Sequence, residues 1–227
     1  MKNERVHFVL HSIFLNFASA SYSDDAKVRF FIDIRKNIMA KVYEFLATGF
    51  EELEALAPVD ILRRGGMDVT TVSVTGSLFV ESSHGVTVKA DQPLEAVDLD
   101  DADLLLLPGG MPGSKNLNAH EGVRQALLAH AAKGRLIGAI CAAPMVLGSL
   151  GLLQGKRATC SPGFEIYLTG AEYTGELVTV DGKIITGEGP AASMPYAYTL
   201  LSQFVDKEAV TALQRKMQFL HLMNVEC

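Results

Sequence analysis

The stretch GAICAAP, residues 138–144, reads as the end of a buried strand that runs without a turn residue into a helix. Cys141 stands at the junction. In an α/β protein, a side chain at such a junction projects from a tight, often strained turn, the nucleophile elbow, into the crevice at the carboxyl ends of the strands. The positive end of the helix dipole favours a thiolate there. The stretch predicts either a reactive cysteine or a small buried residue, since free cysteines are often buried.

Strand-like and helix-like stretches alternate from Ala40 onward. A strand over 40–48, a helix over 51–66 and a strand over 67–74 form a βαβ unit. The other expected elements are a hairpin over 78–91 turning at Ser83 to Gly85, strands over 102–110, 135–141 and 158–161, a second hairpin over 177–187, and helices over 121–134, 143–153, 190–204 and 207–222. This order predicts a doubly wound α/β sandwich, with helices on both faces of a mostly parallel sheet.

Ligands bind such folds at the carboxyl ends of the strands. Three expected loops lie there: 48–52 (TGFEE), 108–114 (PGGMPGS) and 141–144 (CAAP).

The first 38 residues are set apart from this pattern. They have a basic start, an apolar middle and small residues at Ala18 and Ala20, which is a weak form of a secretory signal. The preferred interpretation is a non-native extension upstream of a start at Met39, followed by a single domain over 39–227.

Composition narrows the function classes. The chain has 227 residues, is 48% hydrophobic and carries a net charge of −6 without a basic block, which argues against a nucleic-acid surface. No run has the length and hydrophobicity of a membrane span. Three cysteines without CxxC spacing predict neither a disulfide framework nor a zinc site, and reduced thiols favour the cytoplasm.

Glu54 is the second candidate for chemistry. It shares a helix face with Ala57, Pro58 and Ile61, so we expect it to be buried with a raised pKa. A protonated Glu54 could donate to a thiolate or shuttle a proton during catalysis. The alternative is an acidic residue that complements the helix dipole, which describes Glu51 and Glu52 better.

The glycine pair Gly109 and Gly110 ends a buried strand with backbone N–H groups that no side chain blocks. Such groups suit an oxyanion beside a nucleophile, although an ordinary tight turn is the commoner explanation for two glycines. The loop spells neither a Walker motif nor GxGxxG, so nucleotide binding is weakly supported.

Four motifs in order over residues 40–213 resemble the ThiJ/PfpI superfamily, in the branch of the Parkinson disease associated protein deglycase and its bacterial relatives. They are GFEELEALAPVDILRRGG (49–66), LLLLPGGMPGSKNL (104–117), GAICAAPMVLGSLGLLQGKRATCSP (138–162) and TGEGPAASMPYAYTLL (186–201). The resemblance implies a flavodoxin-like fold, similar to class I glutamine amidotransferases, and a homodimer. It matches Cys141 to the family's oxidation-sensitive nucleophile, Glu54 to its acidic partner, and Gly110 and Ala142, beside Gly109, to the oxyanion donors.

The chain also departs from the family pattern. Ser161 stands where the human-type protein has a histidine, and Ala142 where proteolytic relatives have one. A Cys-His triad is therefore not expected, because of the six histidines only His84 could approach the crevice loops.

Further candidate pocket residues are His84, Ser161, Gly189 and Pro190. A surface turn is the simpler role for His84. Cys160 is expected to pack near the site as a small buried residue, and a resolving role toward Cys141 is the less favoured alternative.

The combined prediction is a cysteine-dependent enzyme of the glyoxalase or deglycase type. It would act on reactive aldehydes or their early glycated adducts, as in methylglyoxal to lactate, and would require neither metal nor organic cofactor. A redox-sensing chaperone that uses oxidation of Cys141 is the rival, and a part in thiazole biosynthesis, as an older family label suggests, ranks last.

Overall fold

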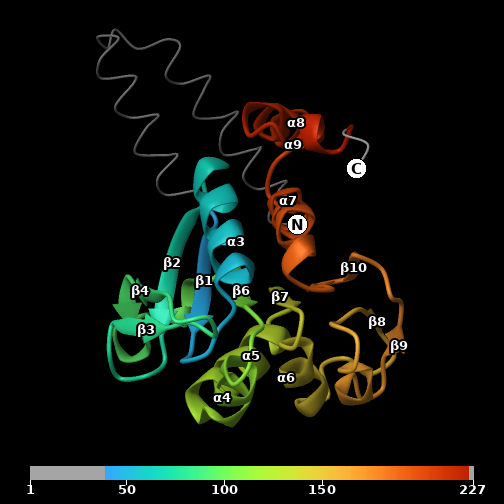
Figure 1. Cartoon of the computed structure of the whole chain (residues 1–227). Coiled ribbons are helices and arrows are strands. Elements are labelled where there is room, and N and C mark those ends of the chain that lie inside the picture. Colours follow the sequence, from blue (N-terminus) through green and yellow to red (C-terminus); the bar gives the residue numbers. More distant parts are fainter. Residues whose placement is uncertain (1–38, 225–227) are drawn as a thin grey trace, which may run out of the picture. The chain divides into compact units, whose positions relative to one another are not determined.

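The structure is a computed structural model that describes residues 39–224, and these residues form one central sheet (Figure 1). Its strand order is β10-β11-β7-β6-β1-β2-β5, and all neighbours pair in parallel except β10 and β11. Its strands are β1 (Lys41–Leu46), β2 (Asp68–Ser73), β5 (Gln92–Pro93), β6 (Leu104–Leu107), β7 (Leu136–Ile140), β10 (Val178–Asp181) and β11 (Ile184–Gly187). The expected doubly wound, mostly parallel sheet is confirmed.

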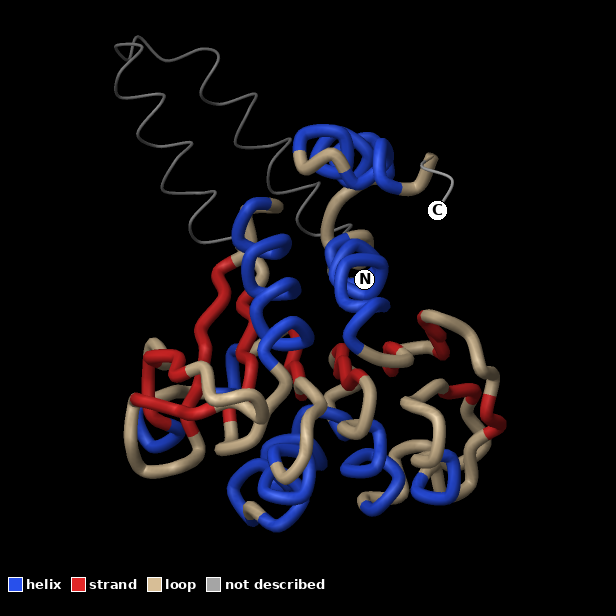
Figure 2. Tube along the Cα trace, in the orientation of Figure 1, coloured by secondary structure: helices blue, strands red, loops and turns tan. Residues whose placement is uncertain are grey.

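Helices cover both faces of this sheet (Figure 2). They are α3 (Glu52–Arg64), α4 (Gly113–Ala119), α5 (Glu121–Ala132), α6 (Pro144–Ser149), α7 (Ser193–Leu201), α8 (Lys207–Lys216) and α9 (Phe219–Leu222). The strands alternate their side chains between two cores. Leu105 and Leu107 pack with α4, α5 and α6, whereas Leu104 and Leu106 pack with α3 and α7.

Two small two-stranded sheets lie apart from the central sheet. One is the predicted hairpin of β3 (Phe79–Glu81) and β4 (Thr87–Lys89), and the other pairs β8 (Arg157–Ala158) with β9 (Glu172–Tyr173). The predicted hairpin of β10 and β11 is also present.

Several predicted boundaries were wrong. The helix expected over 143–153 ends at Ser149, and Gly151 follows with a φ of 71°. The last helix divides into α8 and α9 because Gln218 adopts a left-handed φ of 57°. The strand expected over 158–161 is β8, which ends at Ala158. Helix α4 and the short strands β5 and β9 were not predicted, because their sequences are short and lack a periodic apolar pattern.

From Ala40 on, the described residues form one compact unit. The predictions for residues 1–38 lie outside the described residues. Within 39–224, no helix is both long and apolar enough to cross a lipid bilayer.

The strand order reverses at β1. The chain adds β2 on one side of β1 and later adds β6 on the other. The loops after β1 and β6 then meet at the carboxyl edge, where Glu51 N–H donates to the Gly109 carbonyl at 3.0 Å and Gly113 N–H donates to the Gly49 carbonyl at 3.1 Å. Such a switch point is where open α/β sheets bind ligands.

Candidate active site

Cys141 occupies a strained turn directly after β7. Its φ is 63°, a left-handed value that few non-glycine residues adopt, and its side chain is half-buried. Two hydrogen bonds hold the turn: Cys141 N–H donates to the Gly187 carbonyl at 2.9 Å, and Ser161 N–H donates to the Cys141 carbonyl at 3.0 Å. Strain held in this way is typical of a nucleophile placed at a strand-to-helix turn.

Glu54 lies fully buried in the first turns of α3, as its helix face predicted. Gly109 N–H donates to Glu54 Oε2 at 2.9 Å, and Glu51 Oε2 accepts from Glu54 N–H at 2.7 Å, which caps the helix. Burial raises the pKa of Glu54 to about 7; the nearby Glu51 charge also raises it, while hydrogen bonds with Cys141 and Gly109 lower it. Glu54 therefore exchanges its proton near neutral pH.

The thiolate expected at Cys141 is not favoured. Burial, together with the charge and hydrogen bond of Glu54, raises the pKa of the Cys141 thiol to about 12, although Ser161 and the Gly110 backbone act in the opposite direction. The dipole of α6 does little to stabilise a thiolate here, because this helix begins at Pro144, three residues after Cys141, and has only six residues. Each of the two groups shifts the pKa of the other, so Cys141 and Glu54 titrate as a coupled pair.

The glycine pair differs from its predicted role in one respect. The Gly109 N–H is already bonded to Glu54, so it positions the carboxyl group and is not free for an oxyanion. A Cβ on Gly109 would clash with Glu54 Oε2 and lie 2.7 Å from Cys141 Cβ, so only glycine fits between the two groups. The Gly110 backbone faces the Cys141 sulfur, and buried Ala142 follows it in the chain, so these two remain the candidate oxyanion donors.

Ser161 is brought to the sulfur, where its side chain lowers the pKa of the Cys141 thiol. Gly189 and Pro190 follow β11, and no described contact joins them to Cys141; the nearer residue of that strand is Gly187. Cys160 is fully buried, its pKa is raised to about 12 by burial, and both it and Cys141 are free thiols.

His84 lies on the β3–β4 hairpin, where 68% of its side chain is exposed. Its Nδ1 lies 3.1 Å from Glu52 Oε2, and this carboxylate raises the pKa of His84. Glu51, Glu52 and His84 place one ligand atom each within 4.8 Å of one another, which is the arrangement among the described residues that could hold a metal ion. Glu51 already caps α3 and Glu52 already pairs with His84, so the cluster has a structural explanation.

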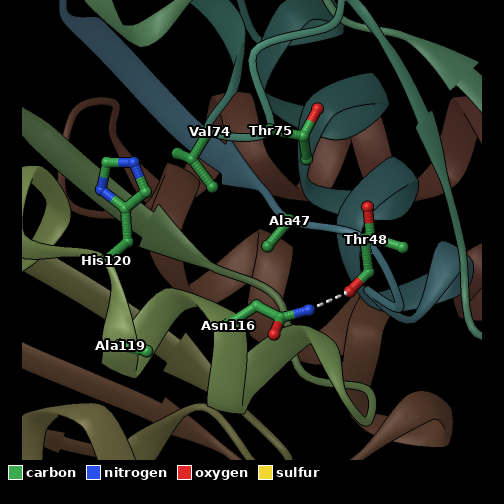
Figure 3. Close-up of a pocket in the computed structure, with 7 residues that line it drawn as sticks. All are labelled: Ala47, Thr48, Val74, Thr75, Asn116, Ala119 and His120. Carbon is green, nitrogen blue, oxygen red and sulfur yellow. Dashed lines mark hydrogen bonds between the residues drawn. The ribbon is translucent and has the colours of Figure 1, made fainter.

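The sequence did not point to a cavity of about 370 Å³ at the carboxyl ends of β1 and β2 (Figure 3). Figure 3 shows Asn116 turned toward Thr48, whose carbonyl accepts its Nδ2–H at 2.8 Å. His120 lines the opposite side. Its Nδ1 caps α5 by accepting from Val123 N–H at 3.4 Å. The lining residues are Ala47, Thr48, Val74, Thr75, Asn116, Ala119 and His120.

One sequence signal could have located this cavity. The loops after the two strands that flank it, Thr48 after β1 and Thr75 after β2, meet at the edge where α/β sheets bind ligands. The contribution of Asn116 could not be predicted, because α4 itself was not recognised.

Comparison with known proteins identifies the family of the chain. Residues 40–203 match the model of the DJ-1/PfpI family. Protein DJ-1 homolog B of Arabidopsis thaliana is 40% identical over 170 residues, which cover 74% of this chain and 39% of that protein. The chain thus spans about two fifths of the length of this curated relative. The Parkinson disease protein 7 homolog of Danio rerio is 34% identical over 173 residues, 74% of this chain and 92% of that protein.

Solved structures and a named activity extend the comparison. The oxidized form of Toxoplasma gondii DJ-1 superposes with a TM-score of 0.76 at 36% identity, covering 79% of this chain and 98% of that one. A more distant relative, 28% identical over 169 residues (74% of this chain, 89% of that protein), is named glutathione-independent glyoxalase DJR-1.2 of Caenorhabditis elegans. The family expected from the four motifs is confirmed, and this chain belongs to the DJ-1/PfpI family.

Proposed function

We propose that the chain is a cysteine-dependent enzyme that converts reactive aldehydes, or their early adducts on other molecules, to hydroxy acids. Methylglyoxal to lactate is the model reaction, and the role is defence against carbonyl and oxidative stress. The observation that carries the proposal is the buried contact between Cys141 and Glu54, whose pKa values are both raised. The glyoxalase name of the Caenorhabditis elegans relative supports the reaction class.

The first step uses the coupled pair. Glu54, with a pKa of about 7, accepts the thiol proton while the Cys141 sulfur forms a bond to the aldehyde carbon. The electrons of the carbonyl π bond move to the oxygen, which the backbone N–H groups of Gly110 and Ala142 stabilise until it is protonated. The product is a hemithioacetal.

The later steps are redox-neutral. Glu54, as the carboxylate, removes the proton from the former aldehyde carbon and gives an enediol, and a proton returned to the neighbouring carbon yields a lactoyl thioester of Cys141. Water then cleaves the carbon–sulfur bond and releases lactate and the thiol. The sum is methylglyoxal plus water to lactic acid, so the sequence of steps requires no external oxidant or reductant.

The surroundings of the sulfur favour this carboxylate-based chemistry over a Cys-His mechanism. Ser161 is the side chain that lies beside Cys141 where the human-type protein has histidine, and His84 pairs with Glu52 on an exposed hairpin. The proton acceptor in contact with the sulfur is Glu54.

A redox-sensing role is the second candidate. The Toxoplasma gondii structure is that of an oxidized DJ-1, and Cys141 here is half-buried beside groups that could hold sulfinate oxygens: a protonated Glu54, the Gly110 backbone and Ser161. A sensor would alter partner binding only after oxidation. An enzyme would turn over aldehyde with Cys141 reduced.

The proposal includes a homodimer and a cytoplasmic location. Leu53 and Leu56 on α3 expose 60% and 39% of their surfaces, and Phe79 on the neighbouring hairpin exposes 64%, so this face offers apolar area to a second copy. The free thiols of Cys141 and Cys160 are consistent with a reducing compartment.

The test measures lactate formed from methylglyoxal by the reduced protein, without glutathione, beside the Cys141→Ser and Glu54→Gln variants. We expect no turnover with Cys141→Ser, and a loss of about 10²-fold or more with Glu54→Gln, because a neutral amide cannot accept the proton. A Cys160→Ser variant is the matched thiol control and should retain turnover. Lactate formation that survives in Cys141→Ser would refute the enzyme proposal, and absent turnover with ready oxidation of Cys141 would favour the sensor.

A further inference from the structure

Two buried polar side chains outside the proposed chemistry lie under α3 and α7. Glu44, in the middle of β1, is 1% exposed, and Tyr196, in the first turns of α7, is also 1% exposed. Among the described residues, neither Glu44 Oε2 nor the Tyr196 hydroxyl has a hydrogen-bond partner, and Glu54 Oε1 shares this property. Three orphan polar atoms in one core are unusual, because buried polar groups are nearly always hydrogen-bonded.

Strand register places these groups on one face of the sheet. Glu44 pairs with Leu106 on β6, and Leu106 pairs with Gly138 on β7, so the three positions form a row across the sheet. The Tyr196 hydroxyl lies directly over Gly138, where a Cβ would clash with it. The Tyr196 ring lies beside Gly187, where a Cβ would be 3.2 Å from its Cδ2. The glycines therefore make room for a tyrosine that reaches over the sheet toward Glu44.

The Glu54 charge also acts on this hydroxyl. The charges that act on the Tyr196 phenol are those of Glu44 first and Glu54 second, and burial raises the pKa of Tyr196 well above its usual range. Helices α3, which carries Glu54, and α7, which carries Tyr196, pack side by side (Figure 1). Tyr196 is thus the phenol on which both Glu44 in β1 and Glu54 beside Cys141 act.

We propose that Glu44, Tyr196 and Glu54 form one buried hydrogen-bonded chain, in which Tyr196 is a positioning residue for Glu54. Neutral Glu44 donates its proton to the Tyr196 oxygen, and the Tyr196 hydroxyl donates to Glu54 Oε1, each directly or through a buried water molecule. The chain holds Glu54 from the side away from Gly109, which already binds Oε2. It satisfies all three orphan atoms and stabilises the Glu54 carboxylate relative to the acid.

The other groups that face this chain are few in the described core. Glu51, at the N-cap of α3, raises the pKa of Glu54, and Arg63 on α3 lowers the pKa of Glu44. From the turn after β7, Cys141 contacts Glu54, and the Gly109 N–H comes from the loop after β6. Burial raises the pKa of Glu44 well above its usual range, which agrees with Glu44 as the neutral donor at the end of the chain.

The consequence is measurable at Glu54, which titrates near neutral pH. If Tyr196 stops donating, the Glu54 carboxylate loses a hydrogen bond and Glu54 holds its proton more tightly. The Tyr196→Phe variant should therefore raise the acid-to-carboxylate ratio of Glu54 near neutral pH by about threefold, equivalent to half a pKa unit.

The experiment follows the infrared carbonyl band of the protonated Glu54 carboxyl group against pH for the full chain, each protein measured beside its own Glu54→Gln partner. Tyr198→Phe is the matched control, because Tyr198 is also a buried tyrosine of α7 but its hydroxyl contacts Met217 Sδ at 3.4 Å instead. Glu44→Leu should shift the ratio in the same direction, and Glu44→Gln, which retains a donor, should keep the profile of the parent protein.

The double variant decides whether the residues act as one chain. Glu44→Leu should add nothing to Tyr196→Phe, because the connection to Glu54 is already cut. A folded Tyr196→Phe protein with the parent profile overturns the proposal, and so does an additive shift in the double variant. If Tyr196→Phe does not fold, the contrast between Glu44→Leu and Glu44→Gln still decides, since equal profiles would overturn it. The readout requires no turnover, so the result is independent of the proposed aldehyde reaction.

Discussion

At the scale of single residues, the site depends on the absence of a side chain at Gly109. Its N–H orients Glu54, and its Cα lies between that carboxyl group and Cys141. The sequence predicted a glycine loop beside a cysteine, and the helix face predicted the burial of Glu54. That the N–H serves Glu54 could not be predicted, because the two residues are 55 positions apart.

Gly109→Ala should abolish turnover and destabilise the fold by about 1–3 kcal/mol, because the new methyl group meets Glu54 and Cys141 in a packed region. Lactate formation and urea unfolding measure the two effects. Gly122→Ala in α5 is the control, since its Cβ would come no closer than 3.1 Å, to Leu94 Cδ2 at the end of a side chain. Full activity in Gly109→Ala would show that the close packing at Gly109 is not needed.

At the scale of elements, α3 presents two different faces. The inner face carries Glu54, Val59 and Leu62 into the core, while Leu53 and Leu56 remain exposed. A helix that covers a sheet normally keeps its outer face polar, so the exposed leucines make this face of α3 the one on which the proposed homodimer can be tested. The periodicity predicted this helix well, since apolar spacing is local information. It failed at α8 and α9, where the break is a single left-handed residue, Gln218.

Leu53→Asp should convert a dimer to a monomer, because a carboxylate would have to be buried in the apolar contact between two copies. Light scattering coupled to size exclusion measures the mass of each species. Leu128→Asp on α5, where the leucine is 37% exposed, is the matched control and should leave the mass unchanged. A Leu53→Asp protein with the mass of the parent dimer would place the interface elsewhere, and a parent protein that is itself monomeric would refute the homodimer.

At the scale of the whole molecule, buried acids make stability depend on pH. The folded pKa of Glu54, about 7, exceeds the usual value of 4.5, so between these values the folded state binds more protons than the unfolded state. Its contribution to the free energy of unfolding is therefore present below about pH 4.5 and is lost as the pH rises to about 7. Glu44 acts in the same direction, whereas His130, whose pKa burial lowers, opposes them.

Glu54→Gln should remove this dependence, because the amide resembles the protonated acid at every pH. We expect the variant to match the parent near pH 4.5 and to exceed its free energy of unfolding by as much as about 3 kcal/mol near pH 8. Urea unfolding at both pH values gives the difference, with Glu95→Gln as an exposed control. An equal difference at the two pH values would mean that Glu54 does not carry a raised pKa.

The sequence by itself determined the main alternation of strands and helices, the mostly parallel sheet, the tight turn at Cys141 and the inward face of Glu54. These follow from apolar periodicity and turn chemistry, which act between residues close in the chain. The family motifs, in order along the chain, led to the family that the comparisons confirmed.

Only the tertiary structure decided which side chains lie in contact and how their pKa values are shifted. It showed that the Gly109 N–H binds Glu54 and that α6 begins three positions beyond Cys141. It also showed the cavity beside His120 and the burial of Glu44 and Tyr196. The physical reason is that a pKa depends on burial and on neighbours within a few ångströms, and those neighbours come from segments far apart in the sequence.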